Sequence, residues 1–471
     1  MTEDLVPAAA AVPGRPLASA RRLILPLALA QFICSFAGSN MNVMINDISD
    51  DLDTTVKGVQ TAITLFLLIM AILMIPCSKL TERWGRKRCF TWGLTLYAVG
   101  ALLSAVSPNL GVLILGNSVF EGVGTALLIP PVYILATLWF SDMTSRAWAF
   151  GVISGLGGIG AAAGPLIGGV ITTGISWRAA FVFQALVVGT IVLLSRRLVD
   201  PLAPDPTRPF DTVGAILSGV GMFCVVFGIL QAGSNNALLA LFLGIGALFL
   251  AWFFLYIRSR ERAHKPALLS TRLFKNRTCN LALVTQNIQW LVLMGTSFVV
   301  SVFLQEVRGY SAIRTGVIFT AATLGILFSS LAAERLAKRY PQKRLIVAGF
   351  VVTLAGIVLL LVLVRASDSI AAFLPGLALI GLGLGGMLTP SVNVVQSSFP
   401  EELQGEISGL SRSVSNLGSS FGTAIAGTIL VSVVANGNRA YAWAMGSLIL
   451  FGLIGLAAAL LLPSKAERQV A

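Results

Sequence analysis

Long apolar stretches alternate with short polar segments along nearly the whole chain. Fourteen such stretches occur, each bounded by Pro, Gly or charge. Their lengths suit helices that cross a membrane, which need about 20 apolar residues. The pattern predicts an all-α membrane protein with fourteen transmembrane helices. The stretches are residues 23–46, 58–78, 89–107, 110–138, 149–174, 179–195, 213–232, 236–257, 280–304, 315–333, 345–364, 371–396, 406–434 and 440–462.

The composition excludes several other classes of protein. Hydrophobic residues make up 56% of the chain and charged residues only 11%, against about 25% charged residues in soluble domains. One His and five scattered Cys predict no metal site and no disulfide framework. A phosphate-binding loop of the form GxxxxGK[ST] is absent, and no nucleophile–base pair stands out, so neither an ATP-driven pump nor an enzyme is expected. We also expect no cofactor.

The cationic residues predict the orientation in the membrane. With both termini in the cytoplasm, the cytoplasmic segments hold 26 Lys and Arg residues and the outer loops hold six. Cytoplasmic loops of membrane proteins carry such an excess. The net charge of +13 therefore reflects topology, and no nucleic-acid partner is expected. The interpretation is a multi-pass protein of the cytoplasmic (inner) membrane, with residues 1–22 and 463–471 as cytoplasmic tails.

Two shifts of the chain against itself reveal an internal repeat. A shift of 254 residues superimposes Gly151, Ile153, Ser154, Gly155, Leu156, Gly164 and Gly168 on identical residues, and a shift of 256 superimposes Leu80, Arg83, Lys87, Arg88 and Gly93 on identical residues. The repeat predicts two six-helix halves, residues 23–197 and 280–462, separated by two inserted helices and linkers at 198–279. Parallel repeats of this kind are typical of transporters with a substrate site between the halves.

One predicted cytoplasmic loop holds a single carboxylate among five cations. It reads Ser78-Lys79-Leu80-Thr81-Glu82-Arg83-Trp84-Gly85-Arg86-Lys87-Arg88. Glu82 can pair with a cation at the end of a neighbouring helix, which makes the loop a candidate cytoplasmic gate; ordinary loop charge is the alternative. The gate candidates are Glu82, Arg83, Gly85, Arg86 and Lys87, with Arg412 from the stretch 406–434.

The stretch 149–174 carries small residues at a spacing of about four. Gly at this spacing lets two membrane helices approach closely, so the helix can act as a hinge or seal, or serve for packing alone. Its motif consists of Gly151, Gly160, Gly164, Pro165, Gly168 and Gly169.

Both segments resemble signatures of the major facilitator superfamily. The loop is similar to G-x-L-A-D-R-x-G-R-K, and the Gly151 to Gly169 string matches the antiporter signature G-x8-G-x3-G-P-x2-G-G at every defined position. Fourteen spans with two between the halves resemble the fourteen-helix drug:proton antiporters of that superfamily. The resemblance covers residues 23–462. It implies the major facilitator fold, alternating access and proton-driven export.

The sequence departs from the family pattern where that family couples transport to protons. Ala37 replaces an Asp usual in the first helix, and Ser118 replaces an Arg usual in the fourth. Glu121, three residues after Ser118, lies mid-helix between Asn117 and Thr125. An acid at membrane depth is costly and usually functional. Glu121 is therefore the candidate proton carrier; it could instead attract cations or join helices as a neutral residue.

Polar side chains recur on predicted membrane helices and predict the substrate cavity. Those of the first helix recur every three or four residues, which places them on one helical face; hydrogen bonding between helices is the alternative. The cavity candidates are Gln31, Ser35, Ser39, Asn42, Asn46, Asn117, Thr125, Gln286, Gln289, Trp290, Asn393 and Gln396.

These features predict a monomeric secondary exporter of amphipathic compounds, with cations as the expected substrates and the proton gradient as the driving force. The alternative is an exporter or flippase for lipids or lipid-like metabolites, with weak or absent proton coupling. The absence of the family's usual Asp at position 37 and Arg at position 118 favours that alternative.

Overall fold

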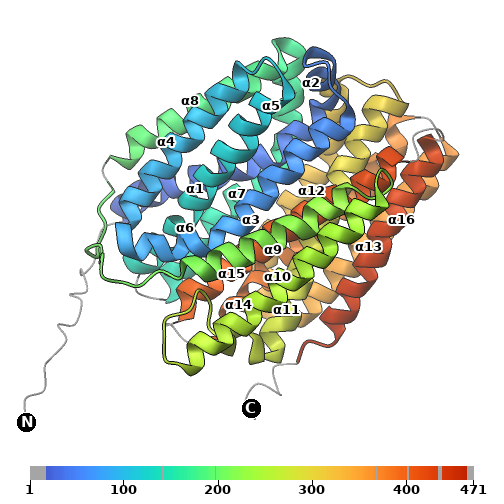
Figure 1. The fold of residues 1–471 in the computed structure, drawn as a ribbon. Coiled ribbons are helices and arrows are strands. Elements are labelled where there is room, and N and C mark those ends of the chain that lie inside the picture. The colour runs from blue at the N-terminus through green and yellow to red at the C-terminus, as the bar shows by residue number, and fades with distance from the viewer. Residues whose placement is uncertain are drawn as a thin grey trace, which may run out of the picture.

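The computed structural model describes residues 17–140, 143–196, 198–367, 369–399, 403–432 and 437–463, and over these ranges the chain is helical without a strand. The tail residues 1–16 and 464–471 lie outside them. Figure 1 shows long helices packed side by side in one bundle, with the first half of the chain at the upper left and the last part at the lower right.

The first half runs through eight α-helices and two other helical segments. A π-helix, η2, interrupts the predicted fourth span and joins α5 to α6. The elements are α1 (Leu17–Asn40), the 3-10 helix η1 (Met41–Val43), α2 (Ile45–Asp51), α3 (Val56–Trp84), α4 (Arg86–Ala105), α5 (Leu110–Leu113), η2 (Ile114–Glu121), α6 (Gly122–Trp139), α7 (Met143–Gly174) and α8 (Trp177–Ser195).

The second half repeats this plan after two inserted helices. The inserted pair is α9 (Thr212–Leu230) and α10 (Asn236–Arg262), followed by η3 (Thr271–Lys275). The remaining elements are α11 (Arg277–Val302), the π-helix η4 (Phe303–Val307), α12 (Ala312–Arg339), α13 (Gln342–Ala366), η5 (Ile370–Ala372), α14 (Leu374–Gln396), α15 (Gln404–Ser432) and α16 (Gly437–Leu460).

Thirteen helical segments among the described residues are long and apolar enough to cross a membrane. The predicted span 89–107 is the exception. It forms helix α4, but this helix mixes Thr, Trp, Tyr and Gly with its apolar residues and is less hydrophobic than the others. The all-α membrane fold is therefore confirmed, whereas the count of fourteen spans is not established.

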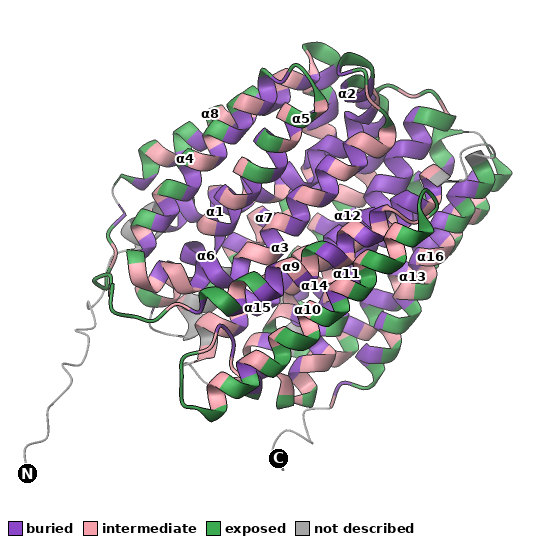
Figure 2. Cartoon of the chain, viewed as in Figure 1, coloured by how far each residue is buried: buried purple, intermediate pink, exposed green. Residues whose placement is uncertain are grey.

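The inserted helices differ in how they pack. In α9, Val226 and Leu230 form a buried cluster with Leu68 of α3 and Ala424 of α15, so α9 covers a seam between the two halves. Helix α10 packs on α9 and is mostly exposed, with Gly246 and Ile257 as its buried residues (Figure 2). Its exposed residues are largely apolar, as expected of a helix that faces lipid.

Within the first half, helix α7 crosses helix α1 closely at glycines of α7. A Cβ atom added at Gly160 would collide with the carbonyl oxygen of Phe32 in α1, and one at Gly164 would collide with the Ser39 hydroxyl. These glycines therefore let the backbones of α7 and α1 touch. By contrast, nothing lies within 4 Å of a Cβ atom added at Gly151.

The second half contains the same crossing. Helix α15, the repeat of α7, packs on α11, the repeat of α1. A Cβ atom at Gly418 would collide with the carbonyl oxygen of Asn287, and one at Gly422 with that of Leu291. Gly418 and Gly422 are the residues that the repeat aligned with Gly164 and Gly168. The two halves thus share one packing rule as well as one sequence pattern.

We predict that Gly164→Leu abolishes function while Gly151→Leu does not. The first change forces a bulky side chain into the α1–α7 crossing, where overpacking costs about 1–3 kcal/mol or more; the second adds the same atoms in open space. Transport by, and thermal stability of, the two purified variants would be compared. Equal transport by both would show that the crossing does not need glycine.

Candidate substrate pathway

A central cavity lies between the two halves, with walls from α1, α3, α6, α7, α11 and α15. The lining combines apolar and sulfur-bearing side chains with amide, hydroxyl and guanidinium groups. The lining residues are Gln31, Cys34, Ser35, Gly38, Phe66, Leu67, Met70, Met74, Ile129, Ala161, Trp290, Met294, Arg412, Ser415, Asn416 and Ser419. Of the predicted cavity residues, the structure brings Gln31, Ser35 and Trp290 to this space.

A chain of polar contacts crosses the gap at one end of this cavity. Gln31 donates through Nε2 to the Ser35 hydroxyl at 3.1 Å, and the Tyr133 hydroxyl donates to Gln31 Oε1 at 3.2 Å. Arg412 of α15 donates through Nη2 to the Tyr133 oxygen, and its guanidinium carbon lies 4.3 Å from the centre of the Tyr133 ring. Because Tyr133 lies on α6, this contact joins the two halves.

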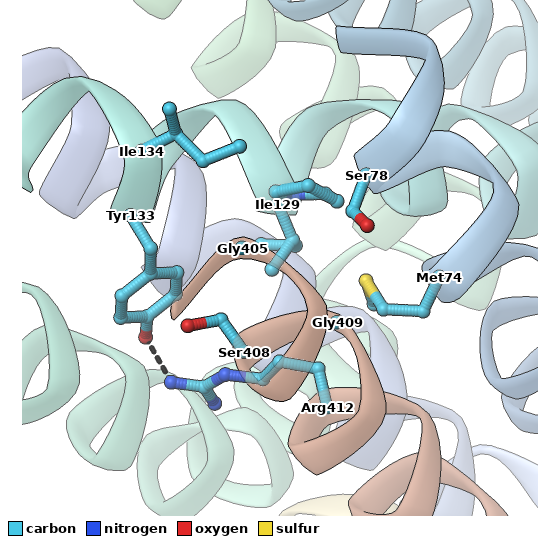
Figure 3. A pocket seen from close by; sticks show the side chains of 10 residues that line it. Met74, Ser78, Ile129, Tyr133, Ile134, Gly405, Ser408, Gly409 and Arg412 are labelled. Carbon is cyan, nitrogen blue, oxygen red and sulfur yellow. Dashed lines mark hydrogen bonds between the residues drawn. The ribbon is translucent and has the colours of Figure 1, made fainter. Parts of the chain in front are cut away.

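A second, smaller pocket lies beyond the Arg412–Tyr133 contact. Figure 3 shows Ser78 and Met74 from α3, Ile129 and Ile134 from α6, and the glycine-rich start of α15 around it. Arg412 and Met74 border both spaces. The pair Arg412–Tyr133 therefore stands at the neck between them; the gate role of Arg412 stays a prediction.

Further contacts between the halves close this end of the bundle, here named the basic end after its cationic loops. Lys79 of α3 forms an ion pair of 2.6 Å with Glu406 of α15. The second oxygen of Glu406 accepts the Ser270 backbone N–H at 3.0 Å. About two turns deeper, the Ser413 hydroxyl donates to the Ala71 carbonyl at 2.5 Å. Together these contacts form the basic-end seal.

The 79–88 loop is held by the linker between α8 and α9. Glu82 pairs with Arg208 of that linker, rather than with a neighbouring helix end as the sequence suggested. Asp200 accepts the Arg86 backbone N–H at 2.7 Å and thereby caps α4. Gly85, with φ of 92°, makes the sharp turn from α3 to α4, and such a φ favours glycine.

The other gate candidates of this loop have different surroundings. Lys87 donates from Nζ to the Arg196 carbonyl at 3.2 Å. The Arg86 side chain is buried and its guanidinium lies 3.8 Å from Asp200. Arg83 is half-buried in the last turn of α3. The loop therefore braces the basic end within the first half, while Lys79 and Arg412 make the contacts across the halves.

Polar contacts also join the halves at the opposite end. Asn42 donates through Nδ2 to the Ser297 hydroxyl at 2.9 Å, and Gln305 donates through Nε2 to the Asn42 carbonyl at 2.9 Å. The Asn46 backbone N–H reaches Gln305 Oε1 at 3.4 Å. Gln60 of α3 donates to the Thr423 carbonyl of α15 at 3.0 Å. This opposite-end seal and the basic-end seal thus join the halves at the two ends of the bundle, with the central cavity between them.

The polar stripe predicted for the first helix is therefore divided between two places. Helix α1 ends at Asn40, and the chain continues as a 3-10 helix and then α2, so one helical face does not extend to Asn42 and Asn46. Gln31 and Ser35 line the cavity. Ser39 instead packs against Gly164, and Asn42 and Asn46 belong to the opposite-end seal.

An ion pair beside the opposite-end seal stays within the first half. Arg178 of α8 pairs with Asp51 of α2 and also donates to the Ser107 carbonyl at 2.9 Å. The Arg178 hydrogen bond lowers the pKa of the Asp51 carboxyl from its ordinary value. A carboxylate with a lowered pKa keeps its pairing until the pH falls through that lower value, so this contact does not respond to changes near neutral pH.

Glu121 lies behind the cavity wall rather than in it. Its side chain is fully buried, and a Cβ atom added at Gly100 of α4 would lie 2.9 Å from Glu121 Cγ. Its nearest polar side chains include Tyr97 and Ser104. Their hydroxyls donate elsewhere, to Gln184 Oε1 at 2.5 Å and to the Gly100 carbonyl at 2.9 Å, so neither oxygen of the Glu121 carboxyl receives a hydrogen bond.

The two polar neighbours of Glu121 along the chain share this environment. Asn117 and Thr125 are fully buried inside the first half and their side-chain polar atoms lack hydrogen-bond partners among the described residues. Neither lines the cavity. Glu121 also closes the π-helix η2, and such wide helical turns are frequent at functional sites.

The predicted cavity residues of the second half mostly serve the packing of that half. The Ser411 hydroxyl donates to Gln286 Oε1 at 2.9 Å, and the Ser391 hydroxyl to Gln289 Oε1 at 2.8 Å. Asn393 is exposed and Gln396 half-buried near the end of α14. Trp290 alone among these predicted residues lines the cavity.

Several residues that line the pathway were not predicted. Tyr133, Ser415, Asn416 and Ser419 supply much of its polar surface, and Met70, Met74 and Met294 much of its apolar surface. Ser411, Ser415, Ser419 and Thr423 recur every four residues along α15, the same periodicity that identified the first-helix stripe. This periodicity in the sequence predicts a polar face on α15 as it does on the first helix.

Two similar helical halves with a cavity between them, joined by polar contacts at both ends, have the architecture of a multi-pass membrane carrier. The chain belongs to the Major Facilitator Superfamily, whose sequence profile matches residues 27–423 and 282–470. Members of this superfamily are carriers rather than enzymes.

Known relatives of the chain include resistance and efflux proteins as well as a vitamin transporter. It is 28% identical over 411 residues to the puromycin resistance protein pur8 of Streptomyces alboniger, covering 86% of this chain and 81% of the relative. It is 28% identical to the multidrug efflux pump LfrA of Mycolicibacterium smegmatis, covering 79% and 73%. The riboflavin transporter RibZ of Clostridioides difficile is 24% identical, with coverage of 85% and 86%.

The fold agrees with a solved transporter structure. The crystal structure of the peptide transporter POT in complex with sulfate superimposes with a TM-score of 0.66 and 15% identity, over 96% of each chain. At this identity the likeness concerns the fold alone.

Proposed function

We propose that this protein is a proton-driven secondary exporter of amphipathic compounds that works as a monomer by alternating access. The observation that carries the proposal is the cavity enclosed between two sets of contacts that each join the halves. Its apolar wall of Phe66, Met70 and Trp290 can hold the hydrophobic part of a substrate, because flexible and aromatic side chains adapt to different shapes. The relatives that are resistance and efflux proteins support export.

In this proposal, the two seals open in turn. Parting α3 from α15 at the basic end breaks the Lys79–Glu406 pair and opens the cavity to one side. Parting η1 and α2 from α11 and η4 at the other end breaks the Asn42–Ser297 and Gln305 contacts and opens it to the other. Each seal consists of a few polar contacts, which can be exchanged for water at modest cost.

Glu121 is the proposed proton carrier. It is the acid that lies deepest among the described residues of the first half, and its carboxyl lacks donors. A negative charge there is unfavourable, whereas a protonated carboxyl can donate to the Tyr97 or Ser104 hydroxyl. Cys34 of α1, its neighbour, lines the cavity. Proton binding can therefore affect the helix that forms the wall.

A second candidate function is the export of lipids or lipid-like metabolites with weak or absent coupling. At the two positions where the related antiporters carry Asp and Arg, Ala37 is buried and Ser118 donates to the Ala62 carbonyl at 2.8 Å. These residues pack helices and carry no charge. The exposed apolar helix α10 beside α9 gives lipid a surface near the seam between the halves.

We propose that the basic end faces the cytoplasm, because cationic loops accumulate on that side. Single cysteines in place of Arg260 and Lys343 should then resist an impermeant thiol reagent added to intact cells, while a cysteine in place of Asp51 should react. The native cysteines are buried and give little background. Labelling of the Arg260→Cys variant from outside would reverse the orientation.

Replacement of Glu121 by Gln tests the proposed function and its coupling. Inverted membrane vesicles would be loaded with ethidium, Nile red or 2-naphthoate in turn, at about pH 6 and pH 8, with and without a pH gradient. Vesicles that contain the wild-type protein should accumulate at least one of these compounds when a gradient is imposed. Glu121→Gln keeps the shape but cannot release a proton, so gradient-driven accumulation should disappear while exchange without a gradient continues.

The control is Glu306→Gln, which neutralises an exposed acid near the opposite end and should leave accumulation unchanged. Full gradient-driven accumulation in vesicles that contain the Glu121→Gln variant would exclude Glu121 as the proton carrier. It would favour the uncoupled lipid exporter. Failure of the wild-type protein to move any of the three compounds would contradict drug export.

A further inference from the structure

Among the described residues that line the two cavities, Arg412 is the one with a formal charge. The sequence suggested a cationic substrate, which Glu121 would attract. The structure instead places Glu121 behind the cavity wall, and neither cavity has an acidic residue in its described lining. The field inside the pathway is therefore positive, and like charges repel strongly where water is scarce.

The Arg412 guanidinium is only partly coordinated by protein. Its recorded contacts are with one residue, Tyr133, through a hydrogen bond to the hydroxyl and stacking over the ring. No carboxylate among the described residues lies within ion-pair distance. Glu406, on the same helix, is engaged by Lys79 and by the Ser270 backbone N–H. A guanidinium has five N–H donors in a planar fork, so donors remain for a ligand.

The other groups around Arg412 suit one end of a ligand. Ser415 and Asn416 follow on the next turn of α15, and Gln31 approaches from α1. These side chains supply hydroxyl and amide donors beside the cation. Phe66, Trp290 and the methionines supply apolar surface to the same cavity. The cavity thus combines donors for a negative oxygen-bearing group with apolar and aromatic side chains for the rest of a ligand.

We propose that Arg412 is the anion-binding residue of the central cavity and that the preferred substrates are amphipathic aromatic carboxylates. This inference rests on the proposed function, because it names the substrate class of the same cavity. Carboxylates match the planar fork of a guanidinium through paired hydrogen bonds.

The position of Arg412 also links substrate binding to the gate. Tyr133 belongs to the first half and Arg412 to the second, so their contact holds the halves together at the neck. A carboxylate that binds Arg412 competes with the Tyr133 hydroxyl for the same donors. Binding therefore replaces a contact between the halves with a contact to substrate, which favours separation of α6 from α15.

Binding to purified protein in nanodiscs tests this assignment without any gradient. The probes are 2-naphthoate and 2-naphthylmethylammonium, which share an aromatic body and differ in charge. A ligand that binds the folded state raises its melting temperature with concentration. Naphthoate should stabilise the wild-type protein at lower concentration than the ammonium compound. Arg412→Gln should raise the half-saturating naphthoate concentration at least about tenfold, because a charge-assisted hydrogen bond is lost.

Three further variants make the result specific. Arg412→Lys keeps the charge but loses the planar fork, so its half-saturating naphthoate concentration should lie between those of the wild-type protein and Arg412→Gln. Arg314→Gln removes the same charge from an exposed site at the start of α12 and should leave binding unchanged. Tyr133→Phe removes the competing hydroxyl without touching the cation, so naphthoate should bind at least as tightly. If Arg412→Gln does not fold, the preference of the wild-type protein for naphthoate over the ammonium probe decides the matter.

Equal naphthoate binding by Arg412→Gln and wild-type protein would overturn the assignment. So would tighter binding of the ammonium probe, weaker naphthoate binding by Tyr133→Phe, or no naphthoate binding at all. None of these results would contradict export itself, since the vesicle assay also measures transport of ethidium and Nile red under a gradient.

Discussion

Inside a bilayer, a polar group that loses its partner gains no water in exchange, so every polar contact between the halves of a carrier must be replaceable. This constraint explains the distribution of polar residues. The two seals consist of a few amides, hydroxyls and one ion pair, placed at the ends of the bundle where water can reach them after opening. The deeper crossings within each half, at Gly164 and Gly418, depend on backbone contact and keep each half rigid while the seals exchange.

Much of the fold could be predicted because membrane helices follow from long apolar stretches and homologous halves from repeated residues. The close crossing at Gly160, Gly164 and Gly168 could be predicted from their spacing, because small residues on one helical face allow another helix to approach closely. The fourth-span acid Glu121 could be predicted as a buried residue. Its distance from the cavity could not, because the hydrophobic pattern does not say which neighbour a helical face meets, and the π-helix η2 changes the phase of that face.

The contacts that define the site come from residues far apart in the chain. Arg412 and Tyr133 are separated by 279 residues. The sequence identifies Arg412 as a charge within a predicted span, but no pattern indicates Tyr133 as its partner. The Glu82 partner Arg208 and the α4 cap Asp200 lie in a polar linker whose path no periodicity specifies. Helix breaks also matter: the change from α1 to a 3-10 helix after Asn40 moved Asn42 and Asn46 from the expected cavity to a seal. Tertiary packing decided these positions.

The central claim is that the two seals hold the halves closed and must open in turn. In a protein whose five native cysteines are replaced, cysteine pairs at 79 and 406 and at 42 and 297 would be cross-linked separately, and transport measured before and after reduction. Each cross-link should form and stop transport, and its reduction should restore transport. Continued transport by a cross-linked protein would show that the seal concerned does not open, which would contradict alternating access through this cavity.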